Sequence, residues 1–245
     1  MTEALFRDDP YLKTLEATVV DRRDDGALVF DRTLFYAVGG GQPSDIGTLA
    51  RADGTTIPIV SAAYGDDAKV TILHRSADGA ALPGIGERVV LSLDWASRYR
   101  HMRMHTALHL LSVALPYAVT GGSIGAAESR LDFDIPDPDI DREAIEAAVN
   151  ETIAGDHPVS FEWITDAELD ANPGLVKTLS VKPPRGSGRI RLVRIGRPDA
   201  TVDLQPCGGT HVRSTAEIGR IAITKIEKKG KINRRVRIAL VDDAV

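Results

Sequence analysis

Two short segments, distant along the chain, each place two metal-binding side chains four residues apart, and they constrain the fold more than any other feature. His105 and His109 lie within a helical pattern that spans about 94–115, and residues four apart share one face of a helix. Cys207 and His211 have the same spacing, but the two glycines between them predict a turn that folds both side chains toward one point. Three imidazoles and one thiolate form the tetrahedral N/S set that zinc prefers.

Each of these pairs has an ordinary explanation when it is taken alone. Two histidines on one helix face are common at protein surfaces, and a single cysteine usually acts as a small core hydrophobe. Cys207 is the only cysteine of the chain, and its combination with the histidine pair favours a metal site. His101 lies one helical turn before His105, as an alternative ligand or as an outer hydrogen-bond partner. The sequence leaves open whether three or four side chains bind the metal.

Length and composition predict one large domain or two small ones. The chain has 245 residues, 43% of them hydrophobic, which is enough for a substantial core. One cysteine excludes an intrachain disulfide and fits a reducing compartment. The first residues have no signal-peptide pattern, and no run of about 18 apolar residues occurs. We therefore expect a cytoplasmic protein without a membrane partner.

The net charge of −5 conceals a strong asymmetry along the chain. The segment from Arg185 to Arg237 contains 14 Lys and Arg against four acids, whereas the remainder contains 16 against 31. A basic segment within an acidic protein favours a bound polyanion such as a nucleic acid. A solvated surface hairpin accounts for the same pattern, and charge alone does not separate the two.

The first 92 residues show strand-like apolar runs separated by turn residues. Their spacing fits a small β-barrel better than a βαβ unit. The predicted strands are 17–20, 27–30, 34–38, 56–63, 70–73 and 89–93. Three consecutive glycines at 39–41 let the backbone approach another group closely. This segment is either an ordinary β-turn or a turn that presents the polar side chain of Gln42.

Residues 93–245 predict an α+β domain, because helical periods dominate its first half and strands its second. The predicted helices are 94–115, 141–153 and a short helix that opens with a capping box at 165–168. The predicted strands are 129–135, 158–164, 189–195 and 201–204, followed by a hairpin of 218–226 and 232–241.

A zinc ion on these residues would polarise a carbonyl or lower the pKa of a bound water to roughly 7. Polar side chains near the ligands, at Thr106, Thr210, Gln205 and Gln42, can select a small substrate by hydrogen bonds. Hydrolysis of an ester or amide is the chemistry that such a site favours. The basic segment suggests that the ester is attached to a nucleic acid.

Three motifs resemble those of the alanyl-tRNA synthetase editing domain and its free-standing relatives, the AlaX proteins. They are His-Thr-Ala-Leu-His-Leu-Leu at 105–111, Cys-Gly-Gly-Thr-His-Val at 207–212, and the glycine segment at 35–47. Their order along the chain matches as well, and the tail from 215 to 237 is similar to the end of that family. The resemblance covers about 34–240.

The resemblance implies a trans-editing hydrolase that removes mainly serine from mischarged tRNA(Ala), with glycine as a second candidate. The implied fold is a β-barrel domain with the glycine motif at 1–92, followed by a zinc-binding editing domain at 93–245 of the threonyl/alanyl-tRNA synthetase type. The implied cofactor is one zinc ion per chain, held by His105, His109, Cys207 and His211. No protein partner is required, and the oligomeric state stays open.

The resemblance also assigns residues to the substrate. Gln42 and Thr106 fall on positions close to the ester and are candidates for catalysis and substrate binding, and Thr210 is a further binding candidate. Six cations are candidates for phosphate contacts: Arg220, Lys228, Lys229, Lys231, Arg234 and Arg235. The nucleophile stays open between a zinc-bound hydroxide and a water or ribose hydroxyl beside a positioning zinc. Two rival functions remain, a non-catalytic zinc-stapled tRNA-binding module and a metal-dependent hydrolase of a small free ester.

Overall fold

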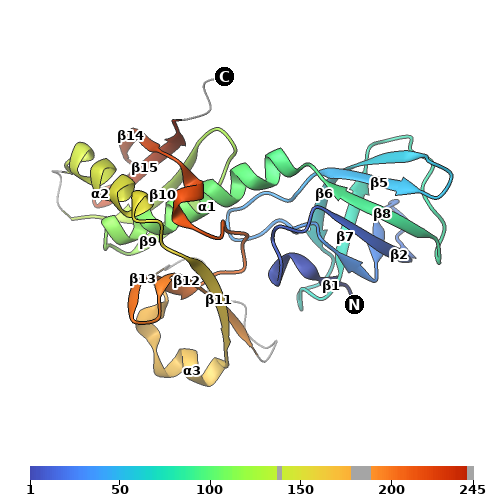
Figure 1. Cartoon of the computed structure of the whole chain (residues 1–245), viewed down its shortest axis with the longest axis horizontal. Helices are drawn as coiled ribbons and strands as arrows, with labels where there is room; N and C mark the ends of the chain where they lie inside the picture. Colours follow the sequence, from blue (N-terminus) through green and yellow to red (C-terminus); the bar gives the residue numbers. More distant parts are fainter. Residues whose placement is uncertain (137–139, 178–188, 242–245) are drawn as a thin grey trace. The chain divides into compact units, whose positions relative to one another are not determined.

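The computed structural model of the chain describes residues 1–136, 140–177 and 189–241 (Figure 1). The chain forms two compact units, Met1–Tyr99 and Arg100–Val245. The domain boundary expected after residue 92 stays a prediction, because the helix α1 (Trp95–Ala114) contributes residues to both units. Among the described residues, no helix combines the length and the apolar run that crossing a bilayer requires.

Unit 1 is built on a closed barrel with the strand order β2-β3-β7-β6-β5-β8. Along its strands apolar side chains alternate with polar ones, so that Val19, Leu49, Ile59 and Leu91 are buried inside. The barrel strands are β2 (Thr14–Arg22), β3 (Leu28–Phe30), β5 (Gly47–Arg51), β6 (Thr56–Tyr64), β7 (Ile72–Ser76) and β8 (Arg88–Leu93). A 3-10 turn η1 (Leu5–Arg7) and the short parallel pair β1 (Glu3–Ala4) and β4 (Arg32–Thr33) complete the unit. The small barrel predicted for this part of the chain is confirmed.

The prediction of a strand at 34–38 is wrong. The segment is almost fully buried at 34–37, but its polar groups are bound outside any ladder. The Tyr36 N–H donates to the Asp45 carboxylate at 2.5 Å, and the Val38 N–H donates to the Ala62 carbonyl at 3.0 Å. A buried apolar segment whose amides are satisfied in this way has the composition of a strand without its pairing.

The glycine segment forms a tight turn. Gly40 and Gly41 have φ values of 58° and 82°, a conformation that favours glycine. The backbones of Gly39 and Gln42 exchange hydrogen bonds of 2.9 and 3.2 Å across it. The turn does not present Gln42 to solvent, because only 1% of this residue is exposed.

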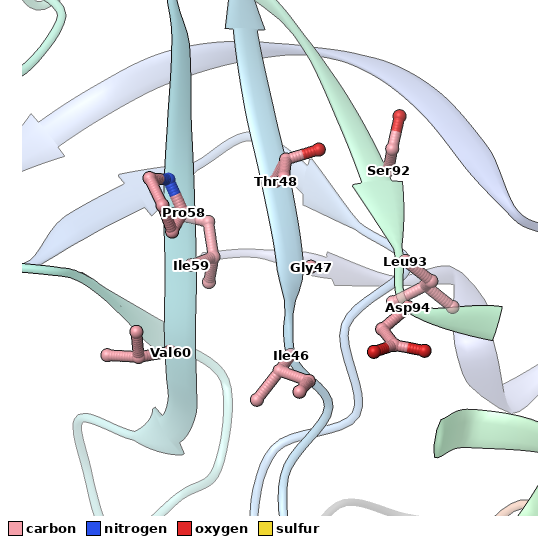
Figure 2. Close-up of a pocket in the computed structure, with 9 residues that line it drawn as sticks. All are labelled: Ile46, Gly47, Thr48, Pro58, Ile59, Val60, Ser92, Leu93 and Asp94. Atoms are coloured by element: carbon pink, nitrogen blue, oxygen red, sulfur yellow. The ribbon is translucent and has the colours of Figure 1, made fainter. Parts of the chain in front are cut away.

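The barrel strands β5, β6 and β8 border a shallow groove of about 450 Å³ (Figure 2). Ile46 and Val60 lie along it and are 40% and 49% exposed. Beside the groove the strands β5 and β8 approach so closely that a Cβ on Gly47 would lie 2.1 Å from the Ser92 carbonyl oxygen. Glycine is therefore required at position 47.

A buried histidine in the barrel predicts a pH-dependent stability of unit 1. Burial, which outweighs backbone hydrogen bonds to Leu28 and Ile72, lowers the pKa of His74 from 6.5 to about 4. Between these values the unfolded chain binds a proton that the folded barrel does not, so the free energy of unfolding rises with pH. We expect urea denaturation to show a loss of about 2 kcal/mol between pH 7 and pH 5 from this group. His74→Gln is expected to remove that loss, and an unchanged pH slope in this variant would contradict the assignment.

Unit 2 contains two sheets, and the strands of the second lie in sequence between the two pairs of strands that form the first (Figure 1). The first sheet has the order β14-β15-β10-β9, and the second has the order β11-β12-β13. The strands are β9 (Val119–Ser123), β10 (Ser129–Asp134), β11 (Val159–Ile164), β12 (Ile190–Arg197), β13 (Ala200–Pro206), β14 (Ile221–Lys228) and β15 (Asn233–Leu240). The remaining elements are α2 (Arg142–Ala154), α3 (Asp166–Ala171), η2 (Pro173–Leu175) and η3 (Thr215–Ile218). The α+β class and the β14–β15 hairpin are as predicted.

Local capping signals set where the helices of unit 2 begin. The Asp141 carboxylate accepts the N–H of Ala144 at 3.0 Å and caps α2. Thr165 and Glu168 form the predicted capping box at the start of α3. Helix α2 is joined to β14 by Asn150, whose amide bonds both the N–H and the carbonyl of Ile221 at 2.9 Å.

Candidate metal centre

The structure brings the two metal-binding pairs together. Helix α1 places His105 and His109 on one face, and the turn after β13 places Cys207 and His211 opposite them. One ligand atom from each of the four residues lies within 4.8 Å of the other three. All three histidines are buried, and Cys207 is partly buried. His101, one turn earlier on α1, is buried but does not belong to this group.

The spacing of the ligand atoms fits a tetrahedral metal ion. The Cys207 Sγ lies 3.5 Å from the His105 Nε2 and 3.3 Å from the His211 Nε2. Zinc–sulfur and zinc–nitrogen bonds at a tetrahedral angle separate S and N by about 3.5 Å. The thiolate and imidazole donors are also the types that zinc binds most readily.

Hydrogen bonds to Nδ1 orient two of the three imidazoles. The His109 Nδ1 lies 2.9 Å from the Asp203 Oδ2, and the His211 Nδ1 lies 3.1 Å from the Thr106 Oγ1. An imidazole held through Nδ1 keeps Nε2 as its lone-pair donor, which is the usual arrangement around a bound metal. We assign the proton to Nδ1 in both rings on the basis of these partners.

Electrostatics favour the metal-binding form of Cys207 and of His211, but not that of His109. Burial alone would raise the pKa of the Cys207 thiol, but the charges and hydrogen bonds of the neighbouring histidines hold it well below its usual value. Burial, together with the charge of His105, lowers the pKa of His211 to about 3. Burial also lowers the pKa of His109, but its hydrogen bonds with Asp203 and Cys207 raise it overall to about 9. Binding a cation here requires His109 to lose that proton.

Sequence reasoning missed the carboxylate that anchors this site. Asp203 is 2% exposed and binds His109 through one oxygen and the Lys177 Nζ, at 2.5 Å, through the other. The Gln205 side chain also donates to Asp203, at 2.8 Å. Burial raises the pKa of Asp203, yet its bonds with His109 and Lys177 hold it far below the usual value. The alternation of β13, which puts positions 203, 205 and 207 on one side, was the available signal.

A second missed residue holds the ligand turn. The Arg191 guanidinium donates to the carbonyls of Cys207 and Gly209, both at 3.0 Å. The Cys207 N–H donates to the Arg191 carbonyl at 3.1 Å, which extends the ladder between β12 and β13. Arg191 is only 7% exposed, so it acts inside the fold.

The predicted substrate contacts have different surroundings. Thr106 and Thr210 are fully buried in unit 2, and Gln42 is buried in unit 1. The Thr106 hydroxyl donates to the Met102 carbonyl at 2.9 Å and lies 3.4 Å from the Val212 amide nitrogen, in addition to its contact with His211. Those partners use its one donor and both acceptor positions.

The six predicted phosphate contacts also divide into two groups. Arg234 is 7% exposed and donates to carbonyls of its own hairpin, and Arg235 forms a two-point ion pair with Asp132. The other four residues are exposed: Arg220, Lys228, Lys229 and Lys231. The three lysines make no ion pair with any other described residue.

Much of the basic segment is neutralised within the fold. Arg237 pairs with Glu227 and Glu128, and Arg194 pairs with Glu162. Arg185, where the segment begins, lies outside the described residues. The three lysines at the β14–β15 turn are therefore part of the charge that remains available to a polyanion.

Part of unit 2 matches a known protein family. Residues 190–237 match the family described as the threonyl and alanyl tRNA synthetase second additional domain. That range contains Cys207, His211, the strand β14 and the first part of β15.

Relatives extend the match to nearly the whole chain. The alanyl-tRNA editing protein AlaX-M of Methanosarcina mazei is 38% identical over 251 aligned positions, covering 100% of this chain and 98% of that protein. The AlaX-M protein of Saccharolobus solfataricus is 35% identical, covering 96% and 98%. The AlaX-L protein of Pyrococcus horikoshii is 35% identical over 94% of this chain and 56% of its own length. The chain belongs to the alanyl-tRNA editing protein family.

Proposed function

We propose that the protein is a trans-editing deacylase that hydrolyses the ester of tRNA(Ala) mischarged with serine, and also with glycine. The main support is the convergence of His105, His109, Cys207 and His211 on one point. The relatives that share nearly the full length are named alanyl-tRNA editing proteins, which supports tRNA(Ala) as the substrate. The chain spans 56% of the AlaX-L relative, so the shorter AlaX-M proteins are the better guide to its activity.

The four ligand residues would hold one zinc ion. A bound zinc ion supplies Lewis-acid polarisation of an ester carbonyl and a lowered pKa for a bound water. The protein's part is to keep the donor set in place. Asp203 orients His109, Thr106 orients His211, and Arg191 holds the turn that carries Cys207.

Recognition of the amino acid requires polar groups beside the ester. We keep Gln42, Thr106 and Thr210 as the candidates, and Gln42 and Thr106 as those closest to the chemistry. A pocket that hydrogen-bonds the serine hydroxyl rejects alanine, because its buried polar groups would remain unpaired at a cost of about 1–3 kcal/mol each.

Binding of the tRNA requires cations that can reach phosphates. Arg220, Lys228, Lys229 and Lys231 are exposed and suit this role. We assign Arg234 and Arg235 to support of the fold instead, because Arg234 binds carbonyls of its own hairpin and Arg235 pairs with Asp132 of β10.

The test is release of serine from Ser-tRNA(Ala) by the zinc-loaded protein, with Ala-tRNA(Ala) as the control substrate. Preferential release of serine, weakening steeply as salt concentration rises, is the expected result. Binding of tRNA without turnover would instead indicate a non-catalytic RNA-binding module. Hydrolysis of small free esters at a rate that RNA and salt do not change would indicate a metal-dependent hydrolase of small esters.

The role of Thr106 can be separated from substrate binding. Thr106→Val keeps the shape of the side chain but removes the hydroxyl beside His211. If Thr106 orients the ligand, zinc affinity falls by about 10- to 100-fold and selectivity between serine and alanine is retained. Thr106→Ser should behave like the original protein. A loss of selectivity at full zinc content would show that the hydroxyl contacts the substrate instead.

A further inference from the structure

The sheet that carries the metal ligand turn has a second polar feature on the same face. Residues directly opposite in a ladder point to the same side of the sheet. Gln205 of β13 pairs with Val193 of β12, which pairs with Phe161 of β11. Gln205 lies 3.1 Å from the His109 ring nitrogen. Phe161 therefore shares the metal-facing side, two strands away, at about 10 Å along the sheet.

Two arginines and two aromatic residues alternate along this side. The Arg191 guanidinium carbon lies 4.7 Å from the centre of the Phe161 ring, and the Arg189 guanidinium carbon lies 4.3 Å from the centre of the Trp163 ring. Trp163 is directly opposite Arg191, and Arg191 also binds the Cys207 carbonyl. We call this set, Phe161, Trp163, Arg189 and Arg191, the aromatic–arginine row. Its two aromatic members are on β11, the edge strand of this sheet.

Burial separates the exposed end of the row from its inner end. Phe161 is 38% exposed, Trp163 is partly exposed and Arg189 is exposed. Arg191 is 7% exposed and holds the ligand turn from inside the fold, and Val193 on the same side of β12 is buried as well. The exposed end therefore presents two aromatic rings, with the Arg189 guanidinium over one of them.

Aromatic rings beside arginines suit one kind of partner, an unpaired nucleic-acid strand. Bases stack on aromatic rings regardless of sequence, and guanidinium groups bind phosphates and stack on rings as well. We propose that the aromatic–arginine row binds the unpaired bases next to the ester at the 3′ end of the tRNA. This inference rests on the proposed function and adds to it the surface that guides the acylated strand to the metal centre.

Kinetics of Trp163 variants test this surface. Trp163→Ala is expected to raise the KM for Ser-tRNA(Ala) by about 5- to 100-fold, the loss expected for one stacked base. The kcat and the zinc content should stay unchanged, because Trp163 does not belong to the ligand cluster. Trp163→Phe should restore most of the affinity. Tyr117→Ala, which removes a 39% exposed aromatic ring of the same unit, is the matched control and should have no effect.

Fluorescence gives a second readout that does not require turnover. The chain has two tryptophans, so Trp95→Phe leaves Trp163 as the only one. Uncharged tRNA(Ala) and a single-stranded RNA tetranucleotide are expected to quench its emission on binding, whereas a blunt RNA duplex should not. Binding of saturating tRNA without quenching, or an unchanged KM in folded Trp163→Ala, would overturn the inference. Absence of deacylation by the original protein would instead count against the proposed function, and the quenching result would still stand by itself.

Discussion

Replacing Cys207 or His109 by alanine is expected to abolish deacylation and metal retention together. Both residues contribute a ligand atom to the cluster, and His109 is the one that Asp203 anchors. Loss of an outer hydrogen-bond partner typically weakens metal binding by 10- to 100-fold, so loss of a ligand should cost more than about 100-fold. The measurements are metal content per chain after dialysis and the rate of serine release, which should fall to that of the reaction without protein.

His157→Ala is the matched control for the ligand variants. It removes a histidine of the same unit that does not belong to the cluster. This variant should keep its metal and its activity. Full activity of Cys207→Ala after removal of metal by a chelator would refute a metal-dependent mechanism. Unfolding of unit 2 on chelation would show that the ion also stabilises the fold, as expected for a site that joins distant segments.

Replacing Arg98 by methionine is expected to destabilise unit 1 by about 3–5 kcal/mol. Arg98 is fully buried and forms a two-point ion pair with Asp45, donating also to the carbonyls of Pro10 and Leu34 at 2.6 and 2.7 Å. Asp45 in turn accepts the Tyr36 N–H, so the pair holds both ends of the glycine segment. Removing one member leaves the other charge buried without a partner, which is more costly than the pair itself is stabilising.

Two further variants isolate the cause in urea denaturation. Arg51→Met removes the same side chain from a pair with Glu87, in which both members are about a quarter exposed, and should cost far less because solvent screens the pair. The double variant Asp45→Asn with Arg98→Met leaves no unpaired charge and should recover part of the lost stability. Equal losses of unfolding free energy for Arg98→Met and Arg51→Met would show that burial does not make the loss of a partner more costly.

The elements with a strong local signal were predictable from sequence. The histidine helix, the capping box at Thr165 and the terminal hairpin have caps, periods and turn residues that act within a few positions. Besides the two-residue strands β1 and β4, the strands β5 and β9 were missed, because their sequences are short and contain glycine and threonine. The opposite error occurred at 34–38, where residues 34–37 are buried but the segment is bound by Asp45 and Arg98 instead of a strand.

Within the metal centre, the ligand residues could be predicted and their supports could not. Three histidines and one cysteine in two pairs of matching spacing favour a metal-binding site. Asp203 and Lys177 are one acid and one lysine among many in the sequence. They are identified only by the packing that brings Asp203 of β13 beside His109 and Lys177. A hydrogen bond forms wherever two side chains meet within about 3 Å, whatever their separation along the chain.

Sequence by itself determined which donors are present, how they are spaced and which segments have the periods of helices and strands. The tertiary structure decided which cations stay exposed, since Arg234 binds carbonyls of its own hairpin and Arg235 pairs with Asp132 of β10, while three lysines remain exposed. It also decided that Gln42 is buried and that the aromatic–arginine row lies beside the ligand turn. The physical reason is range: periodicity and capping are interactions between near neighbours, whereas burial and charge pairing depend on which distant strands come together.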